Sequence, residues 1–229
     1  QLLQNLGYTY LSPEEAFQAR GQKLTNVLLE TILEKQIKKI NKITFKGYER
    51  SFSDSSIRNA IRLLKDIHLE GLIHTNEKIF DLLSLGESFK EDIDGDVKSP
   101  QLRYIDWETP SNNTFHVTEE FEVEKSSSHE TRRPDIVLFV NGIPFAVIEC
   151  KRRDLEDSIE QAISQQSRNQ KTDEIPRLFI YTQLLMSLSV NGAKYATVGT
   201  PAKFWSFWRE REEINNNLFK LINTTLSVT

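Results

Sequence analysis

The chain has 229 residues, of which 38% are hydrophobic and 27% charged, and its formal net charge is −4. This composition supplies enough apolar material for a folded core, and it excludes a disordered tail, a collagen-like chain and a disulfide scaffold. The single cysteine, Cys150, cannot form an intramolecular disulfide, and no apolar run approaches the roughly 20 residues that span a bilayer, so we expect a cytoplasmic protein with no membrane partner.

The first hundred residues favour helices. Residues 12–15, Ser-Pro-Glu-Glu, are typical of a helix start, with proline at the first helical position and acids in the first turn. Apolar residues recur at three- and four-residue steps over 24–40, which predicts an amphipathic helix there. Two interpretations of its outer lysines stay open, a solvated surface or an edge that contacts phosphates. These lysines are Lys35, Lys38, Lys39, Lys42 and Lys46.

A second helix is expected from Ser53 and Asp54 to about Leu69, with Gly71 near its end. After Pro110 the sequence changes to short runs rich in β-formers, and Asn-Gly pairs at 141–142 and 191–192 indicate two hairpins. The expected strands are 115–123, 135–140, 143–150, 177–182, 184–190 and 194–198, with a polar helix over 154–170 and a C-terminal helix over 204–222.

This order of elements predicts an α/β or α+β core with a helical N-terminal portion, and not a doubly wound sheet. We expect a mainly helical portion over 1–104, the core over 105–203 and a C-terminal helix within 204–229. Because the chain begins with Gln1 rather than Met, we also expect it to be part of a longer protein.

Charged residues stand at the open ends of the two most apolar strands. Strands that are apolar on both faces are buried, so Asp135, Glu149 and Lys151 should lie at the edge of the core. Two carboxylates placed together repel one another unless they are protonated or bridged by a cation. Residues 101–150 carry four basic and nine acidic side chains, which suits a cation held beside a polyanion, although uneven surface charge also explains the counts.

The hairpin turn decides whether these side chains converge. A two-residue turn that pairs Val140 with Ile143 would place Asp135 opposite Ile148 and send Glu149 to the other face. A three-residue loop pairs Phe139 with Ile143 instead, with Gly142 in the left-handed conformation that glycine favours. We expect the three-residue loop, because it sets both acids and Lys151 on one side.

The pattern Pro134-Asp135…Glu149-x-Lys151 resembles the PD-(D/E)XK nuclease signature. The sequence of residues 133–151 resembles, more specifically, that of the N-terminal nuclease domain of the restriction (R) subunit of type I restriction-modification enzymes. The resemblance covers most of the chain. Its further matches fall at residues 6–8, 112–117, 176–179, 189–192, 195–200 and 204–205.

The resemblance implies a restriction-endonuclease-like core, a mixed sheet flanked by helices. It also implies that Asp135, Glu149 and the backbone carbonyl of Cys150 bind Mg²⁺ or Mn²⁺. Lys151 would hold the attacking water or stabilise charge on the phosphate, and the substrate would be duplex DNA. The implied partners are the methyltransferase (M) and specificity (S) subunits. ATP would act only through motor domains outside this chain, which contains no P-loop motif.

The family also has a Gln-x-x-x-Tyr motif on the helix after the Glu-x-Lys strand. Gln165 matches it, but Asn169 stands in place of the tyrosine. The resemblance implies that these two residues contact the DNA backbone or support the metal ligands indirectly. Arg152 and Arg153 are expected either to contact phosphates or to be ordinary surface charges.

Two more residues have alternative interpretations. Glu30 is either a third acid near the metal or an ordinary solvated residue, and Cys150 is expected to be a small buried hydrophobe.

Two further functions also stay open: a stand-alone nuclease of the same fold, and a non-cleaving module that binds DNA or docks the methyltransferase complex.

Overall fold

A seven-stranded sheet forms the centre of the computed structural model, which describes residues 1–152, 158–189 and 192–209. Two neighbouring strand pairs, β1 with β8 and β12 with β13, are parallel, and the other pairs are antiparallel. This mixed sheet with several helices confirms the expected fold class. Its strands, in spatial order, are β1 (Thr9–Tyr10), β8 (Phe115–Glu119), β11 (Ile136–Val140), β12 (Ile143–Cys150), β13 (Leu184–Ser189), β14 (Gly192–Ala196) and β15 (Ser206–Phe207).

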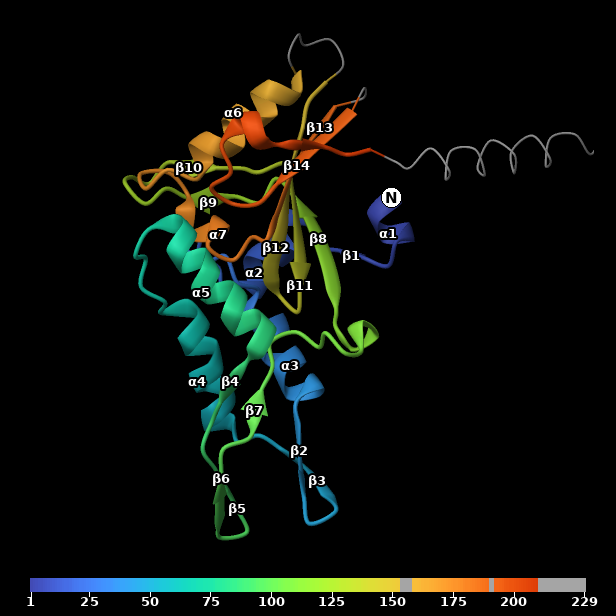
Figure 1. The fold of residues 1–229 in the computed structure, drawn as a ribbon, viewed down its shortest axis with the longest axis vertical. Coiled ribbons are helices and arrows are strands. Elements are labelled where there is room, and N and C mark those ends of the chain that lie inside the picture. The colour runs from blue at the N-terminus through green and yellow to red at the C-terminus, as the bar shows by residue number, and fades with distance from the viewer. Residues whose placement is uncertain (153–157, 190–191, 210–229) are drawn as a thin grey trace, which may run out of the picture.

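Helices cover one face of this sheet, which we call the core face. In Figure 1, α6 lies beside β13 and β14 at one end of the molecule, and α4 and α5 run together along one side. The longer helices are α2 (Pro13–Ala19), α3 (Glu30–Ile40), α4 (Asp54–Lys65), α5 (Leu72–Leu85) and α6 (Ser158–Asn169), and α1 (Leu2–Asn5) and α7 (Pro176–Phe179) are single turns.

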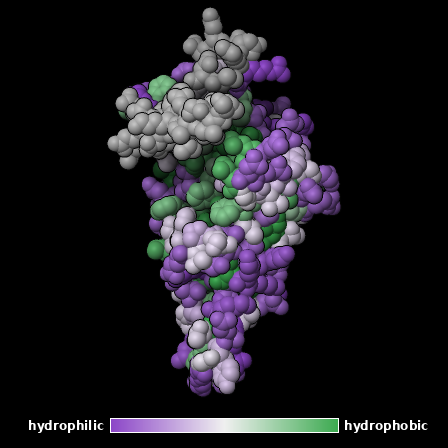
Figure 2. Space-filling model, turned by 90° about the vertical axis from the view of Figure 1, so that its right-hand side faces the viewer, coloured by the Kyte–Doolittle hydropathy of each residue, from purple (hydrophilic) through white to green (hydrophobic). Residues whose placement is uncertain are grey.

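The opposite face, called the outer face here, is covered less. A cavity of about 360 Å³ lies between α1 and this face, and its lining includes Leu3, Ile136, Ile148 and Leu188. Figure 2, which views the molecule from this side, shows apolar atoms gathered in the upper middle of the surface. Among the described residues, no helix is both long and apolar enough to cross a membrane.

Small hairpins extend the molecule at the end far from α6 (Figure 1). They lie within residues 1–104, which the sequence predicts to be mainly helical. The described residues also form two 3₁₀ turns, η1 (Pro110–Asn112) and η2 (Ala202–Phe204). The hairpin pairs are β2 (Lys42–Phe45) with β3 (Tyr48–Ser51), β4 (Glu87–Ser88) with β7 (Gln101–Leu102), and β5 (Glu91–Ile93) with β6 (Asp96–Lys98).

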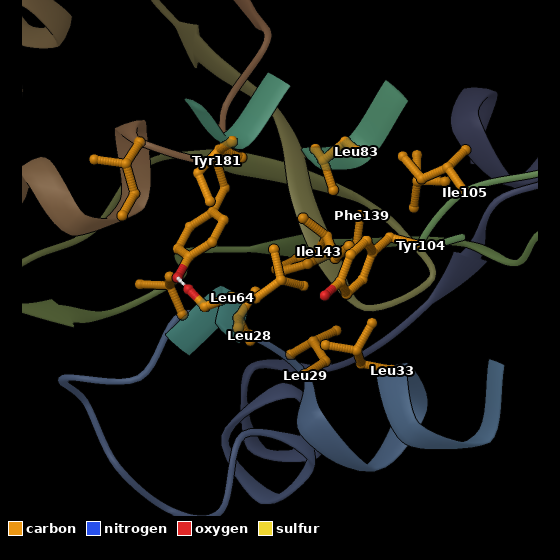
Figure 3. Close-up of a cluster of buried hydrophobic side chains, with 14 of the residues drawn as sticks. Leu28, Leu29, Leu33, Leu64, Leu83, Tyr104, Ile105, Phe139, Ile143 and Tyr181 are labelled. Carbon is orange, nitrogen blue, oxygen red and sulfur yellow. Dashed lines mark hydrogen bonds between the residues drawn. The ribbon is translucent and has the colours of Figure 1, made fainter. Parts of the chain in front are cut away.

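The core joins the N-terminal helices to the sheet. Figure 3 shows Leu29 and Leu33 beside Phe139 and Ile143 of the central hairpin. In the same cluster the Tyr181 hydroxyl donates a hydrogen bond to the Leu64 carbonyl at 2.7 Å. The division of the chain at residues 104 and 105 stays a prediction.

Several predicted helix and strand boundaries are confirmed. Ser12 caps α2 with a reciprocal capping box to Glu15, and Ser53 caps α4 through the backbone of Ser56. The strand predicted over 143–150 is β12, with the same bounds. At these positions the signal is local, because a cap and a run of apolar β-formers can both be recognised within a few residues of sequence.

The helix predicted over 24–40 is wrong in its first part. The helix α3 begins only at Glu30, after a non-helical stretch in which Val27, Leu28 and Leu29 are all buried. The Leu29 amide donates to the Gly142 carbonyl at 2.8 Å. This bond to the hairpin turn holds the segment in its non-helical path, and a single sequence does not reveal such a distant partner.

Two predictions in the middle of the chain are also wrong. The second helix ends at Lys65, and Gly71 is the N-cap of a further helix, α5, which is not among the predicted elements. The strand predicted over 177–182 is instead α7, which begins at the buried Pro176. The Asn76 side-chain amide on α5 donates to the Phe179, Ile180 and Thr182 carbonyls, and these bonds stabilise the turn.

The remaining differences concern strand ends. The strand predicted over 115–123 divides into β8 and β9 (Val123–Glu124), because Glu120 has a positive φ of 46° and β9 pairs with β10 (Thr131–Arg132). Gly192, expected in the second hairpin turn, is the first residue of β14 and pairs with Ser189, while 190–191 lie outside the described residues. The C-terminal helix was expected from Phe204, but this residue ends η2 and is followed by β15, while 210–222 lies outside the described residues.

Candidate active site

A β-bulge brings the two predicted acids together. Near the turn, Val140 pairs with Ile143, but the register shifts between Leu138 and Phe139, so that Ile136 pairs with Ile148. Continuing this register by one residue places Asp135 opposite Glu149. Residues directly opposite each other project from the same face of a sheet, and here it is the core face.

The three-residue loop expected from the sequence is therefore wrong. The turn has two residues, 141–142, and a uniform register would have sent Glu149 to the outer face. The bulge on β12 adds one residue at Phe145, which the shifted pairing leaves unmatched. The convergence of the two acids is confirmed, although the register that produces it differs from the expectation.

Asp135 is held on both sides by the backbone. Its Oδ2 accepts a hydrogen bond from the Cys150 amide at 2.7 Å, and its carbonyl accepts one from the Glu120 amide at 2.9 Å. The first bond joins the beginning of β11 to the end of β12. Asp135 thus has a fixed orientation at the open end of the hairpin.

Glu149 is fully buried beside Asp135. Its Oε2 accepts a hydrogen bond from Gln165 Nε2 at 2.7 Å, whereas Oε1 has no hydrogen-bond partner among the described residues. Burial, followed by the charge and hydrogen bonding of Asp135, raises the pKa of Glu149 to about 8, while Lys151 and Arg168 act in the opposite direction. A charged Glu149 is therefore costly unless a cation lies close to it.

Lys151 reaches the same point through Gln165. Its Nζ donates to Gln165 Oε1 at 2.7 Å, so one amide on α6 bridges the acid and the amine. The Lys151 backbone amide donates to the Leu188 carbonyl of β13 at 2.9 Å, which extends the sheet pairing past Cys150. Three of the predicted site residues, Glu149, Lys151 and Gln165, thus form one hydrogen-bonded chain next to Asp135.

The oxygen atoms at this point fit a hard divalent cation. The described residues contain no group of three or more His, Cys, Asp and Glu side chains suited to a metal, so a cation here would rely on two carboxylates and a backbone oxygen. Mg²⁺ commonly binds one or two carboxylates and keeps several waters. The unpaired, buried Glu149 Oε1 beside Asp135 is the observation that fits such an ion.

The structure places the remaining predicted site residues in different surroundings. Cys150 is exposed rather than buried, because it is the last residue of β12 and lies past the buried part of the strand. Arg152 is exposed, and Arg153 lies outside the described residues. Asn169 is buried, and its Oδ1 accepts a hydrogen bond from Arg168 Nη2 at 3.0 Å. The roles of Arg152 and Asn169 stay predictions.

Glu30 is not a third acid of this site. It begins α3, next to the hairpin turn, whereas the acids lie at the open end, about 20 Å away at 3.3 Å per strand residue. Its carboxylate accepts a hydrogen bond from Asn26 and pairs with Lys65 Nζ at 2.7 Å. The alternative interpretation was an ordinary solvated residue, and Glu30 is instead half-buried and paired within the chain.

Four of the five lysines near α3 have partners within the chain. Lys38 pairs with Glu34 and Asp54, and Lys46 pairs with Asp96. Lys39 Nζ donates to a backbone carbonyl and Lys42 Nζ to a serine hydroxyl. α3 and the β2–β3 hairpin also lie toward the end of the molecule opposite α6 (Figure 1), so these lysines are far from the two acids.

One charged residue of the site region was not singled out from the sequence. Arg168 lies on α6. Its charge contributes to the lowered pKa of Glu174 and partly opposes the rise in the pKa of Glu149. Its position three residues after Gln165 is the signal that could have found it, because residues at that spacing neighbour each other on a helix.

Known proteins similar to this chain are consistent with the geometry. A 213-residue match, 30% identical, relates it to the "Putative type I restriction enzyme MjaIXP endonuclease subunit" of Methanocaldococcus jannaschii, covering 90% of this chain and 19% of the relative. The type I restriction enzyme HindI endonuclease subunit of Haemophilus influenzae is 26% identical over 222 residues, covering 95% and 20%.

The chain spans about a fifth of the length of these curated relatives. The family model described as type I restriction enzyme R protein N terminus matches residues 1–204, a stretch that includes both carboxylates, Lys151 and α6. By this match the chain belongs to the family of type I restriction enzyme R protein N-termini.

Proposed function

We propose that this chain is the metal-dependent nuclease domain of a type I restriction R subunit, and that it hydrolyses phosphodiester bonds of duplex DNA. The observation that carries the proposal is the meeting of Asp135, Glu149 and Lys151 at one end of the sheet, with a buried carboxylate oxygen that has no hydrogen-bond partner in the described part of the chain. A module that only binds DNA gains nothing from a fully buried acid placed beside a second acid, because the repulsion between the two carboxylates destabilises the fold.

Asp135 and Glu149, with the Cys150 carbonyl, would hold Mg²⁺, and Mn²⁺ suits the same oxygen ligands. When bound, such an ion supplies a coordinated water of lowered pKa and offsets the charge of the scissile phosphate. The Lys151 ammonium, oriented by Gln165, stabilises negative charge that develops on the phosphate or orients the attacking water. Gln165 also fixes the Glu149 carboxylate through Oε2.

The proposed partners follow from the family. The relatives are endonuclease subunits about five times the length of this chain. We propose that cleavage follows DNA translocation by ATP-dependent motor domains of the longer protein, together with methyltransferase and specificity subunits. The absence of a disulfide and of an apolar span in the sequence supports a cytoplasmic location for this assembly.

Metal binding by two variants tests this proposal. Asp135→Ala should abolish binding of Mg²⁺ and Mn²⁺ in a calorimetric titration, because the remaining carboxylate provides too few ligands. Asp81→Ala, which removes an exposed carboxylate from α5, should bind the metal as wild type does. Equal binding by wild type and Asp135→Ala would refute the proposed site.

A further inference from the structure

α6 buries one stripe of its surface against the sheet. Ala162 and Ile163 lie on this stripe, at the spacing that an amphipathic helix requires. Gln166 lies on the same stripe one turn later and is also fully buried. A buried amide costs free energy unless its polar atoms are hydrogen-bonded, so simple packing does not explain this glutamine.

The sheet has a second buried polar residue beneath α6. Ser187 lies within β13 and is fully buried, and in register it neighbours Glu149 on β12 and Lys194 on β14. Strand residues paired in this way project from one face. Its hydroxyl has no hydrogen-bond partner in the part of the chain that the structure describes.

Gln166 reaches the backbone directly before Ser187. Its Nε2 donates to the Met186 carbonyl at 2.7 Å, which fixes the amide against β13. The Oε1 of the same amide is buried and has no partner within the described residues. One hydroxyl and one carbonyl oxygen are thus both unpaired in the layer between α6 and β13, although nearly all buried polar atoms in proteins are hydrogen-bonded.

Both residues adjoin the candidate active site. Gln165, the next residue on α6, bridges Glu149 and Lys151. Successive residues of a helix differ by a fixed rotation, so an anchor at Gln166 determines the direction in which Gln165 points. Ser187 is the neighbour of Glu149 on the adjoining strand.

We propose that Gln166 and Ser187 are positioning residues for this site, an inference that rests on the proposed function. The Gln166 amide anchors α6 to β13, and the Ser187 hydroxyl and Gln166 Oε1 share one ordered water between helix and sheet. The hydroxyl donates to this water, and the water donates to the amide oxygen. The anchored helix then holds Gln165 at hydrogen-bonding distance from both Glu149 and Lys151.

The chemistry of the pair supports this arrangement. An internal water needs two to four polar partners, and the two unpaired atoms supply one donor and one acceptor. Residues that orient metal ligands without touching the metal typically change metal affinity or activity about 10- to 100-fold when replaced. Loss of either group should therefore weaken metal binding, although neither residue is a ligand.

The experiment measures the Mg²⁺ dissociation constant by calorimetry in the complete R subunit that contains this chain. Gln166→Met keeps the side-chain volume without the amide, and Ser187→Ala removes only the hydroxyl. Each should raise the dissociation constant about tenfold or more. Ser164→Ala is the matched control, because Ser164 is exposed on α6 next to Gln165, and it should bind Mg²⁺ as wild type does.

A double-mutant cycle separates positioning from general stability. If Gln166 acts through Gln165, then Gln166→Met should cause no further loss of affinity in a Gln165→Ala background, whereas independent effects would add. Gln166→Met and Ser187→Ala should likewise be non-additive, because they disrupt one bridge. Additive losses, or single variants that bind Mg²⁺ like wild type, would overturn the inference.

Asp135→Ala in the same series distinguishes this inference from the proposed function. If Asp135→Ala binds Mg²⁺ as well as wild type does, the proposed function fails and the positioning role fails with it. If Asp135→Ala loses the metal while Ser187→Ala and Gln166→Met keep it, only the positioning role fails. Melting temperatures identify any unfolded variant, and Ser187→Ala, the smaller change, then decides the outcome.

Discussion

Gln165 satisfies an acid and an amine with one amide group. Its nitrogen donates to Glu149 and its oxygen accepts from Lys151, both at 2.7 Å. Lys151 is therefore kept beside Glu149 by a neutral group, and no ion pair joins these two residues within the described chain. An ammonium that is not neutralised by a direct carboxylate partner keeps its charge available for a phosphate.

Replacement of Lys151 should separate cleavage from folding. In the complete R subunit, Lys151→Ala should reduce DNA cleavage by roughly 100-fold or more, as expected when charge stabilisation of a transition state is lost. ATP hydrolysis by the proposed motor domains and the melting temperature should stay unchanged, because Lys151 belongs to the proposed nuclease site and not to those domains. A joint fall of cleavage, ATPase and stability would instead identify Lys151 as a structural residue.

Gly142 is required by the fold for two reasons. Its φ is +84°, and a Cβ atom at this position would lie 2.6 Å from the Leu29 carbonyl oxygen. Gly142→Ala should therefore lower the free energy of unfolding by more than the roughly 1–2 kcal/mol of a left-handed alanine. Gly95→Ala is the matched control, since Gly95 has a φ of +86° with nothing within 4 Å of its Cβ position. Equal losses in urea unfolding would refute the close contact.

Among the helices and strands, those that depend on local signals are predicted from the sequence, whereas those that depend on distant contacts are not. The helix start at Ser12 and the apolar run of β12 are local signals, and the sequence predicts the start of α2 and both bounds of β12 correctly. The turn α7 was predicted as a strand from its β-forming residues. Asn76, about a hundred positions earlier, donates to the carbonyls of Phe179 at its end and of Ile180 and Thr182 just after it, and these bonds hold the turn. Such a partner is not visible in local composition.

Ion pairs to one carboxylate, Glu174, join the β9–β10 hairpin to the segment before α7. Arg132 Nε and Nη2 donate to the two oxygens of the buried Glu174 at 2.6 and 2.9 Å, and Lys125 Nζ lies 3.6 Å away. Hydrogen bonding and charge from Arg132 lower the pKa of Glu174. The hairpin is thus held most firmly when Glu174 is ionised.

Low pH should weaken the ion pairs of Glu174. A carboxyl group whose pKa is lower in the folded than in the unfolded state stabilises the fold above the unfolded value, about 4.3 for Glu, and loses that contribution as the pH falls through the folded pKa. Urea unfolding of wild type should therefore lose more stability between pH 7 and pH 3 than unfolding of Glu174→Gln. Arg132→Met should flatten the profile in the same way, and parallel profiles for all three proteins would contradict the prediction.

At the scale of the whole molecule, charge limits DNA binding. The net charge is −4, and the lysines near α3 are largely engaged by neighbouring groups. Lysines that are paired in this way are less available to neutralise phosphates. The chain on its own should bind duplex DNA weakly, with little or no sequence preference, and cleave it weakly if at all.

The affinity of the chain for DNA should fall steeply as the salt concentration rises. With about four to six phosphate contacts, affinity should fall roughly two to three orders of magnitude between 50 and 200 mM salt. Fluorescence anisotropy with a labelled duplex, repeated on an unrelated sequence of the same length, measures both the slope and the preference. Tight, salt-resistant binding to one sequence would indicate a self-sufficient restriction enzyme instead.

The sequence predicted the convergence of Asp135, Glu149 and Lys151 but not its geometry. Two apolar strands and a glycine turn limit the hairpin to a few registers, and only some of these place both acids on one face. The bulge that selects the register depends on how β12 packs between β11 and β13. That packing involves residues about forty positions apart, which the local pattern of Asn141-Gly142 does not contain.

The bulge at Phe145 also restricts how this hairpin can change length during evolution. Because alternate residues of a strand face opposite sides, one inserted residue on a single strand would turn Asp135 or Glu149 away from its partner. An insertion matched by one on the opposite strand would move the turn and leave the two acids facing each other. Among functional relatives, the number of residues between the aspartate and the glutamate should therefore vary in steps of two, unless a second bulge compensates.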